Sequence, residues 1–570
     1  MQHPQVDSQV RWSDLCWIAL FIALLIGAGL GLRDPWPADE PRFASLARDM
    51  VASGDWLIPR VGGDLYQDKP PVFFWLLALS YSIFGSVRAS FLLPSLLAAF
   101  ATCVLVYDLA RRLHGRSAGL AAALTLACSL QFVQTMRGAQ IDPTLLALCT
   151  LSLWAFARHL LQGPAWGLCF LGGVAAGLGV ITKGVGFLPL LLLAVFFALR
   201  RAGWPGLMRE AGGARWLLPA LGFLLAVSIW LVPMLIVVGQ SGSPELIAYR
   251  DEILLQQTVE RYATSWHHVK PWYYFIVEVI PGLWLPFSAL LFWLVPRWRG
   301  DWAERRAAVF LPLCWVLVVL VFFSLSPGKR GVYLLPALPA LALAASPHLA
   351  QLYARVSIGR LSLALAAVLV VAGDVFAALA LTGHPKVLAM LAEGGITSAM
   401  PVAAFAVSGT LAWLLCAWRR PLLAWPAVLA SLAVCWGLLI APAMNSERST
   451  SGFMARALQL APRDRPLALV AYKEQFLLFM DRETWNFGHR RWREGPQEAY
   501  DAAAWLNAAS GRVLLLPETA LSPCFVSARR TLVGEASRDQ WYLVEGVAAA
   551  ECATKGDAGR AIRYPAHPIG

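Results

Sequence analysis

The stretch "DLCWIALFIALLIGAGLGLRD", residues 14–34, decides what kind of protein this chain forms. Its apolar run is long enough to cross the hydrocarbon core of a bilayer, which takes about 20 residues. No small-residue cleavage site follows it cleanly, as one would after a secretory signal. The sequence therefore predicts a first transmembrane helix that is retained.

The composition of the whole chain agrees with this beginning. Of 570 residues, 58% are hydrophobic and only 14% are charged, which is outside the range of soluble proteins. We therefore expect a polytopic α-helical membrane protein surrounded by membrane lipid. The formal charge of +12 comes from basic residues scattered in short loops, so no long basic run indicates a nucleic acid partner.

Apolar runs of near-spanning length recur along the chain and predict about 13 transmembrane helices. They are residues 14–32, 90–110, 117–135, 143–161, 165–182, 185–199, 216–239, 271–296, 306–325, 331–349, 358–382, 400–418 and 421–442.

The distribution of Arg predicts how these helices are oriented. Arginines collect in the loops 111–116, 200–215, 297–306, 355–360 and 419–420, which all fall on one side of the alternation. Short loops rich in Arg and Lys stay in the cytoplasm. We therefore expect a multi-pass membrane protein with a cytoplasmic N-terminus and a polar tail on the outer side.

Two domains are predicted. Residues 1–444 form the transmembrane domain, with long periplasmic loops at 33–89 and 240–271. The first loop contains two helical segments, "RFASLARDMVASGDW" (42–56) and "PPVFFWLLALSYSIFG" (70–85), which we expect to lie in the outer membrane interface.

Residues 445–570 are polar enough to form a small soluble α/β domain in the periplasm. Strand-like runs "PLALVAY", "RVLLLPE" and "WYLVEG" accompany one amphipathic helix near "PQEAYDAAAWLNAAS". Cys524 and Cys552 are the two cysteines of this tail, and an oxidising compartment would make them a disulfide candidate. The other eight cysteines lie in apolar runs without the spacing of metal ligands.

Polar side chains gather at the predicted outer ends of the helices and in the outer loops. They are Asp39, Glu40, Arg42, Lys69, Arg137, Asp142, Lys183, Arg261, His267, His268, Lys270, Lys329, Arg330 and Tyr333. Carboxylates beside cations suit a reaction in which a lipid-linked phosphate leaves, because fixed Lys and Arg stabilise its developing charge where water is scarce. A carboxylate can then act as a base or stabilise positive charge on a sugar ring.

The order of several short motifs makes this expectation specific. The motifs are "DEPRFA" (39–44), "ASGDW" (52–56), "YQDKPP" (66–71), "ITKG" (181–184), "ERYA" (260–263), "HHVKPWYY" (267–274) and "GKRGVYLLPALPALAL" (328–343). In this order the chain resembles the bacterial lipid-linked-sugar glycosyltransferases of GT-C architecture. The resemblance is greatest to the aminoarabinose transferases that modify lipid A, within the broader protein-mannosyltransferase-like group.

This resemblance implies roles for individual residues. Asp39 would be the catalytic carboxylate, and Lys69 would bind the donor phosphate together with Arg261 and Tyr333. Asp142 occupies a matching site at the outer start of a helix. The remaining expected substrate-binding residues of these motifs are Glu40, Arg42, Lys329 and Arg330.

The implied activity is inverting transfer of a sugar from an undecaprenyl-phosphate donor to an envelope acceptor at the periplasmic face. The acceptor could be a lipid A phosphate, a glycan or a protein hydroxyl. Asp68 stands where the relatives often have Glu, which leaves the sugar and the acceptor open. No cofactor is required by this chemistry, although His267, His268 and Asp68 offer a weakly supported site for a divalent ion.

Each residue also has a purely structural interpretation. Asp39 and Asp142 precede helices and could be caps, Lys69 could snorkel, and Tyr333 could belong to an aromatic belt. Arg261 could pair with a neighbouring Glu, and Lys329 and Arg330 could be ordinary loop charges. Glu278 and Asp374, inside predicted spans, are expected to be buried in hydrogen bonds. They are the best support for the alternative function, a membrane transporter or lipid flippase.

Overall fold

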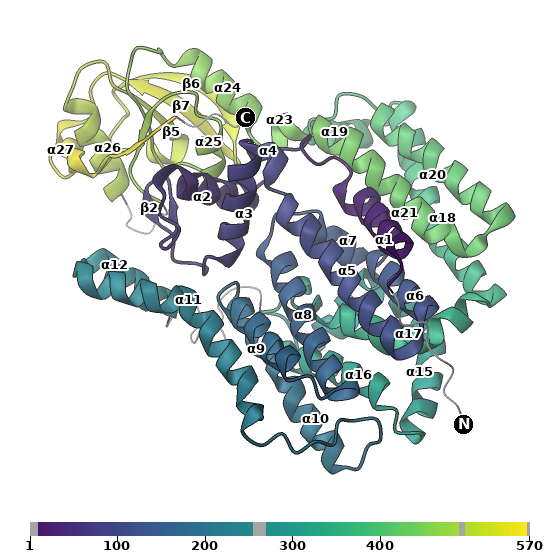
Figure 1. Cartoon of the computed structure of the whole chain (residues 1–570). Helices are drawn as coiled ribbons and strands as arrows, with labels where there is room; N and C mark the ends of the chain where they lie inside the picture. The colour runs from purple at the N-terminus through teal and green to yellow at the C-terminus, as the bar shows by residue number, and fades with distance from the viewer. Residues whose placement is uncertain (1–9, 255–268, 490–495, 567–570) are drawn as a thin grey trace.

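The computed structural model describes residues 10–254, 269–489 and 496–566. A helical bundle forms most of the molecule, and a domain with a central β-sheet lies against one end of it (Figure 1). The N-terminus lies toward the opposite end of the bundle. The predicted class, a polytopic helical membrane protein with a C-terminal α/β domain, is therefore confirmed.

Many helices of the described part are long and apolar enough to span a membrane. Eight such stretches pass on length and composition: Val87–His114, Ile141–Gln162, Gly184–Arg201, Gly213–Ser241, Ala307–Leu325, Val356–Leu381, Met400–Arg419 and Pro421–Ala443. Two bent helix pairs would raise the number to ten. These pairs are Arg116–Ala127 with Leu130–Met136, bent by 64°, and Phe275–Leu283 with Phe287–Ala303, bent by 105°.

The predicted number of about 13 spans is larger than this criterion supports. The three remaining expected segments are helical but shorter, namely Trp12–Gly27, Trp166–Val180 and Ala337–Tyr353. The last of these, α17, is buried along nearly its whole length among other helices. A helix that contacts protein rather than lipid on every side needs neither the length nor the apolarity of a lipid-facing one.

The bundle follows the chain in this order. Its elements are α1 (Trp12–Ile22), η1 (Ala23–Gly27), α5 (Leu93–His114), α6 (Arg116–Ala127), α7 (Leu130–Met136), α8 (Ile141–Gln162), α9 (Trp166–Val180), η2 (Gly184–Leu190), α10 (Leu191–Arg201), η3 (Gly213–Leu217), α11 (Leu218–Ser241), α12 (Pro244–Asp251), η5 (Phe275–Val279), α14 (Ile280–Leu283), α15 (Phe287–Ala303), α16 (Ala307–Leu325), η6 (Gly331–Leu334), α17 (Ala337–Tyr353), α18 (Val356–Leu381), α19 (Pro385–Glu393), α20 (Met400–Arg419), η7 (Pro421–Leu423), α21 (Ala424–Cys435), η8 (Trp436–Ile440) and α22 (Ala441–Ala443).

Small residues bring α9 and α11 into close backbone contact. A side chain at Gly173 would collide with the backbone of Pro219, 2.0 Å from its carbonyl oxygen. One turn later, a side chain at Gly177 would meet the Phe223 carbonyl oxygen at 2.5 Å. Glycines four residues apart form one face of a helix, and in a membrane such a face allows close packing.

The first outer loop is ordered and helical. It contains α2 (Glu40–Ser53), the hairpin β1 (Arg60–Val61) and β2 (Asp64–Leu65), α3 (Val72–Phe84) and α4 (Val87–Ser90). Both expected helices are present, and each ends at a glycine with positive φ, Gly54 at 73° and Gly85 at 64°. A left-handed residue ends a helix at little cost only when it has no side chain.

The C-terminal domain has a six-stranded mixed sheet with strand order β6-β7-β5-β3-β4-β8. Its strands are β3 (Leu467–Leu469), β4 (Thr484–Asn486), β5 (Val513–Pro517), β6 (Arg529–Ala536), β7 (Asp539–Glu545) and β8 (Ile562–Tyr564). Its helices are α23 (Asn445–Arg448), α24 (Ser451–Leu460), α25 (Glu474–Leu478), η10 (Glu518–Ala520), α26 (Gln497–Asn507), α27 (Ala550–Ala553) and η11 (Ala558–Arg560). Apolar clusters cover both faces of the sheet, so the domain has its own core.

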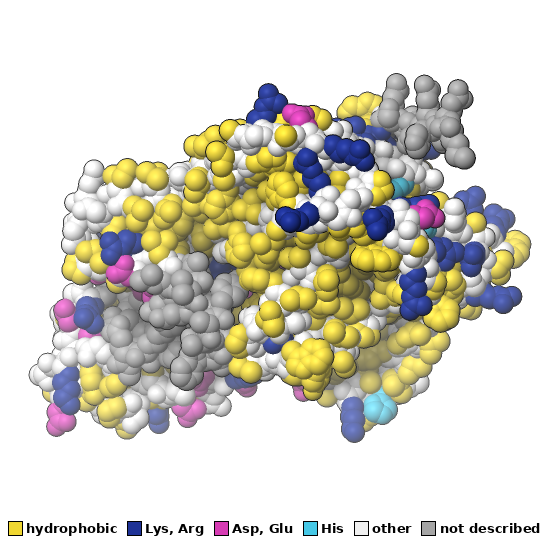
Figure 2. Space-filling model, turned by 90° about the horizontal axis from the view of Figure 1, so that it is seen from below, with side chains coloured by type: hydrophobic (Ala, Val, Ile, Leu, Met, Phe, Trp, Pro, Cys, Tyr) yellow, Lys and Arg dark blue, Asp and Glu magenta, His cyan; other side chains and the backbone are white. Residues whose placement is uncertain are grey.

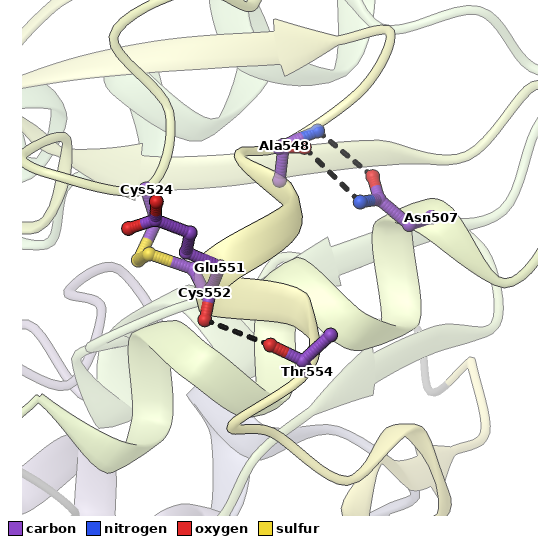
Figure 3. The surroundings of a disulfide bond; sticks show 6 residues. All are labelled: Asn507, Cys524, Ala548, Glu551, Cys552 and Thr554. Carbon is purple, nitrogen blue, oxygen red and sulfur yellow. Dashed lines mark hydrogen bonds between the residues drawn. A yellow bond between two sulfur atoms is a disulfide. The ribbon is translucent and has the colours of Figure 1, made fainter.

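A disulfide joins Cys524, in the segment after β5, to Cys552 in α27 (Figure 3). This is the pairing that the sequence suggests for the tail. Beside it, the Asn507 side chain makes hydrogen bonds of 2.8 and 3.1 Å to the backbone N–H and carbonyl of Ala548. The disulfide therefore fixes α27 to the segment after β5, and the Asn507 hydrogen bonds fix the chain before α27 to the end of α26.

The opposite end of the bundle carries the basic loops. Lys and Arg side chains gather over this end among hydrophobic ones (Figure 2). Exposed arginines of the loops predicted to be cytoplasmic are Arg201, Arg209, Arg215, Arg299, Arg305, Arg306, Arg355, Arg360, Arg419 and Arg420.

Candidate functional site

Asp39 stands at the start of α2 with an accessible carboxylate. It occupies the N-cap position, yet its side chain caps none of the described N–H groups of the helix. A third of the Asp39 side chain, 33%, is exposed. The cap interpretation therefore does not account for this carboxylate, which is available for another partner.

Arg42, one turn into α2, lies among three carboxylates. Its Nε donates to Glu474 Oε1 at 2.8 Å, while its Nη1 lies 3.8 Å from Asp39 Oδ1 and 4.0 Å from Asp68 Oδ2. Burial opposes the charge of Arg42, but Glu474 and Asp39 outweigh it and raise the pKa of the guanidinium. Burial also opposes the charge of Glu474, and here Arg42 prevails and lowers the pKa of the carboxyl. Both partners of this pair are thus charged at neutral pH.

Lys69 directly follows Asp68, whose carboxylate lies 4.0 Å from Arg42 Nη1. Its segment is joined to the bundle where the Val72 N–H donates to the Ile181 carbonyl at 3.4 Å. Since Lys183 is two residues from Ile181, this hydrogen bond connects the two lysine-bearing segments. The chain thereby places "YQDKPP" beside "ITKG", although more than a hundred residues separate them.

A second group of charges lies at the outer ends of the bundle helices. Lys183 Nζ donates to Asp142 Oδ1 at 2.7 Å, and the ammonium lies 5.0 Å from the centre of the Tyr333 ring. Asp142 is in the first turn of α8, whose N-cap is Gln140. Asp142 therefore has a specific charged partner, and Tyr333 faces a cation besides contributing an aromatic side chain.

The loop that carries Tyr333 is fixed by buried polar contacts. Gln131 donates through Nε2 to the Gly331 carbonyl at 2.6 Å and accepts at Oε1 from the Trp284 indole at 2.7 Å. Lys183, Asp142 and Tyr333 thus project from three segments whose backbones are held in place.

Glu40 is buried beside the site, and its expected role in substrate binding stays a prediction. It is buried and accepts from both Arg33 terminal nitrogens, at 2.5 and 2.8 Å. It also accepts from the Trp36 and Ala139 backbone N–H groups at 2.8 and 3.0 Å. These four bonds occupy its carboxylate, so Glu40 ties α2 to the segment before α8 and thereby positions Asp142.

Two further expected ligands have other positions. Lys329 is buried and donates through Nζ to the carbonyls of Ser326 and Lys270, at 2.5 and 2.9 Å, so it ties two loops together. Its role as a substrate ligand stays a prediction. Arg330 is exposed. Arg261, His267 and His268 lie outside the described residues.

Asp374 and Glu278, the two side chains that support a transporter, each lie near a polar or charged side chain. The Thr410 hydroxyl donates to the Asp374 carboxylate, and its Oγ1 lies 3.1 and 3.0 Å from the two carboxylate oxygens. Glu278 is not buried as expected, because its side chain is 53% exposed and lies 3.9 Å from Lys270 Nζ. Within the described ranges, no three His, Cys, Asp or Glu side chains form a group that could hold a metal ion.

The sequence alone does not identify two residues of the site, Glu474 and Arg33. Glu474 is in the soluble tail, 432 residues after Arg42, and no motif surrounds it. Arg33 looks like the ordinary end of the first span. Lys183 stands in the quoted "ITKG" motif and among the outer-face cations, but received no specific role. Its pairing with Asp142 gives it one.

Sequence relatives share part of this chain. Residues 68–232 match the family described as Dolichyl-phosphate-mannose-protein mannosyltransferase. The undecaprenyl phosphate-alpha-4-amino-4-deoxy-L-arabinose arabinosyl transferase of Pseudomonas aeruginosa (strain UCBPP-PA14) is 33% identical over 344 residues, 58% of this chain and 59% of that protein. Arabinosyl transferase 2 of Sodalis glossinidius (strain morsitans) is 30% identical over 337 residues, 58% of each protein. The matched segments span less than two thirds of these relatives.

The structural likeness extends further along the chain. ArnT from Cupriavidus metallidurans, whose crystal structure was solved bound to undecaprenyl phosphate, superimposes with a TM-score of 0.69 at 20% identity. The match covers 93% of this chain and 98% of that one. The chain therefore has the GT-C type of fold that ArnT has. In sequence it is similar to the aminoarabinose transferases.

Proposed function

We propose that this protein is a glycosyltransferase that moves a sugar from an undecaprenyl-phosphate donor to an acceptor at the periplasmic face of the inner membrane. One observation carries the proposal. Arg42 lies near the carboxylates of both the accessible Asp39 and Asp68. Asp68 directly precedes Lys69, and the hydrogen bond from Val72 to Ile181 joins the segment of Lys69 to the segment of Lys183. The relatives' names make the 4-amino-4-deoxy-L-arabinose donor the first to test. The resemblance drawn from the sequence motifs makes lipid A phosphate the first acceptor.

The proposed reaction uses the charges in distinct roles. An acceptor oxygen attacks the anomeric carbon, the bond from that carbon to the phosphate oxygen breaks, and the configuration at the carbon inverts. Lys69, Lys183 and Arg42 stabilise the charge on the departing undecaprenyl phosphate. Asp39 takes the proton if the acceptor is a hydroxyl, or stabilises positive charge on the sugar ring if the acceptor is an anionic phosphate.

The orientation belongs to the same proposal. We place the C-terminal domain and α2 in the periplasm and the N-terminus in the cytoplasm. The arginine-rich loops at the opposite end of the bundle support this orientation through the positive-inside rule. The disulfide in the tail supports an oxidising compartment on that side.

We also propose that transfer requires no metal ion, because fixed cations are already present for a phosphate leaving group. Transfer should then be unaffected by EDTA. A loss of transfer in EDTA that a divalent ion restores would contradict this part of the proposal.

The decisive experiment measures undecaprenyl phosphate released from sugar-loaded donor by purified protein. The Asp39→Asn variant should lose at least about 100-fold in kcat, the typical lower range for removing an acid–base group. Asp55→Asn is the matched control, since Asp55 follows the same helix but accepts from the backbone N–H groups of Leu57 and Ile58. Asparagine can still accept those bonds, so this variant should retain transfer.

The same experiment separates the enzyme from a transporter or flippase. A transporter would move intact donor between leaflets and release no undecaprenyl phosphate. Donor movement without cleavage, or wild-type turnover by Asp39→Asn, would reject the proposed function.

A further inference from the structure

Glu474 is the closest partner of Arg42, although it belongs to the other domain. It is the first residue of α25, and its Oε1 accepts from Arg42 Nε at 2.8 Å. His489 Nε2 lies 3.5 Å from the same oxygen. Glu474 is therefore held between a residue of the catalytic loop and a residue of its own domain.

The helix that carries Glu474 is fixed against the helix that carries Arg42. Arg48, on α2, donates from Nη2 to the Leu477 carbonyl of α25 at 3.0 Å. Leu477 and Leu478 are fully buried. The distance between Arg42 and Glu474 is thus set by the packing of two helices and not by their side chains alone.

Of the three carboxylates around Arg42, Glu474 lies at hydrogen-bonding distance and the other two do not. A charge-assisted hydrogen bond is about 2.7–2.9 Å long, which the Glu474 contact satisfies. The separations of 3.8 Å to Asp39 and 4.0 Å to Asp68 are too long for hydrogen bonds. Without Glu474, the guanidinium would be free to turn and form a direct pair with Asp39.

We infer that Glu474 is a positioning residue that keeps Arg42 from pairing directly with Asp39, so that the C-terminal domain completes the active site. This inference rests on the proposed function of Asp39. A direct ion pair would use the lone pairs of Asp39 that the acceptor proton or the sugar ring requires. Loss of Glu474 should therefore slow the chemical step while leaving donor binding largely intact.

The test uses Glu474→Gln, which keeps the shape of the side chain and removes its charge. We expect kcat to fall at least about tenfold, since a misplacement of 1 Å can cost about 100-fold, while KM for the donor stays within about twofold. Glu474→Asp, which retains the charge, should recover part of the rate. Glu545→Gln is the matched control, because Glu545 pairs with Arg465 within the same domain at 3.3 Å.

A double variant distinguishes positioning from a structural effect. If Glu474 acts by restraining Arg42, Glu474→Gln should have little further effect on kcat once Arg42 is Gln. Multiplicative losses in the double variant, or a change in KM alone, would overturn the inference.

Melting temperatures test the pair independently of any activity. The shifts caused by Arg42→Gln and Glu474→Gln should be less than additive in the double variant, because both remove the same ion pair. Additive shifts would overturn the inference even if the wild type transfers sugar. If the wild type transfers no sugar while the shifts are non-additive, the proposed function fails and the contact between the domains stands.

Discussion

Lys183 and Asp142 form a direct ion pair of 2.7 Å at the outer end of the bundle, and both side chains are largely buried. Asp142 begins one helix and Lys183 follows another, so the pair fixes a cation where two helices meet. The carboxylate orients the ammonium by accepting from one of its three N–H donors.

Replacing Lys183 should weaken binding of the lipid phosphate. A hydrogen bond to a charged group contributes about 1.5–3 kcal/mol, so Lys183→Met should reduce affinity for undecaprenyl phosphate at least about tenfold. The affinity can be measured by titrating purified protein with undecaprenyl phosphate. Lys386→Met, at an exposed lysine of α19, should leave the affinity unchanged. Equal affinities for wild type and Lys183→Met would show that this cation does not contact the phosphate.

Glu40→Gln should destabilise the protein rather than alter one catalytic step. The change removes one partner of the buried Arg33 pair, and breaking such a pair costs about 3–5 kcal/mol. We expect a lower melting temperature and lower yield. Glu304→Gln, at an exposed pair with Arg306, should cost less than about 1 kcal/mol. A Glu40→Gln protein that melts like the wild type but loses transfer would support Glu40 as a substrate ligand.

Asp49 should make stability depend on pH at the contact between α2 and the C-terminal domain. Burial raises the pKa of its carboxyl from 3.8 to about 6, although Arg48 and Tyr564 oppose the rise. The folded protein then holds a proton that the unfolded chain has released, so the stability contributed by this group falls as pH rises from about 4 to about 6. The loss above this window is about 3 kcal/mol.

The Asp49→Asn variant checks this prediction, because asparagine does not titrate. Its melting temperature should rise relative to that of the wild type as the pH increases from 4 to 7. A constant difference across this range would show that Asp49 has an ordinary pKa.

Reducing the disulfide should destabilise the C-terminal domain. Cys524 and Cys552 are 28 residues apart, and closing a loop of this size stabilises by about 3–4 kcal/mol in the chain-entropy model. A reductant should lower the melting temperature of the wild type and leave the Cys524→Ser/Cys552→Ser variant unchanged. In intact spheroplasts, a maleimide that cannot cross the membrane should label the reduced wild type above the level of this variant. Equal labelling of the two proteins would contradict a periplasmic tail.

Local patterns predicted the elements of the fold better than the contacts between them. The helix 42–56 with its end at Gly54, and the runs that became β3, β5 and β7, are each visible in a few consecutive residues. The strands β4, β6 and β8 give no such signal, because β4 (TWN) and β8 (IRY) contain no apolar run and β6 is largely exposed. Their pairing depends on the rest of the sheet.

The candidate site shows the same limit. Asp39 and Glu40 are adjacent, and no local pattern states which one faces outward. The geometry at the start of α2 turns Glu40 toward Arg33 and leaves Asp39 accessible. Glu474 was missed because its relation to Arg42 exists only once two domains have packed together.

The contact of α2 and the following hairpin with the C-terminal domain limits how segments can be exchanged between relatives of this protein. Arg48 and Asp49 both hydrogen-bond to Tyr564, and the hairpin carbonyl of Gly62 accepts from the Asn486 amide. A chimera that exchanged residues 445–570 alone would set these buried polar groups against an unmatched surface. Crossovers that transfer residues 40–65 together with the tail should yield folded hybrids far more often, because both sides of this contact then come from the same parent.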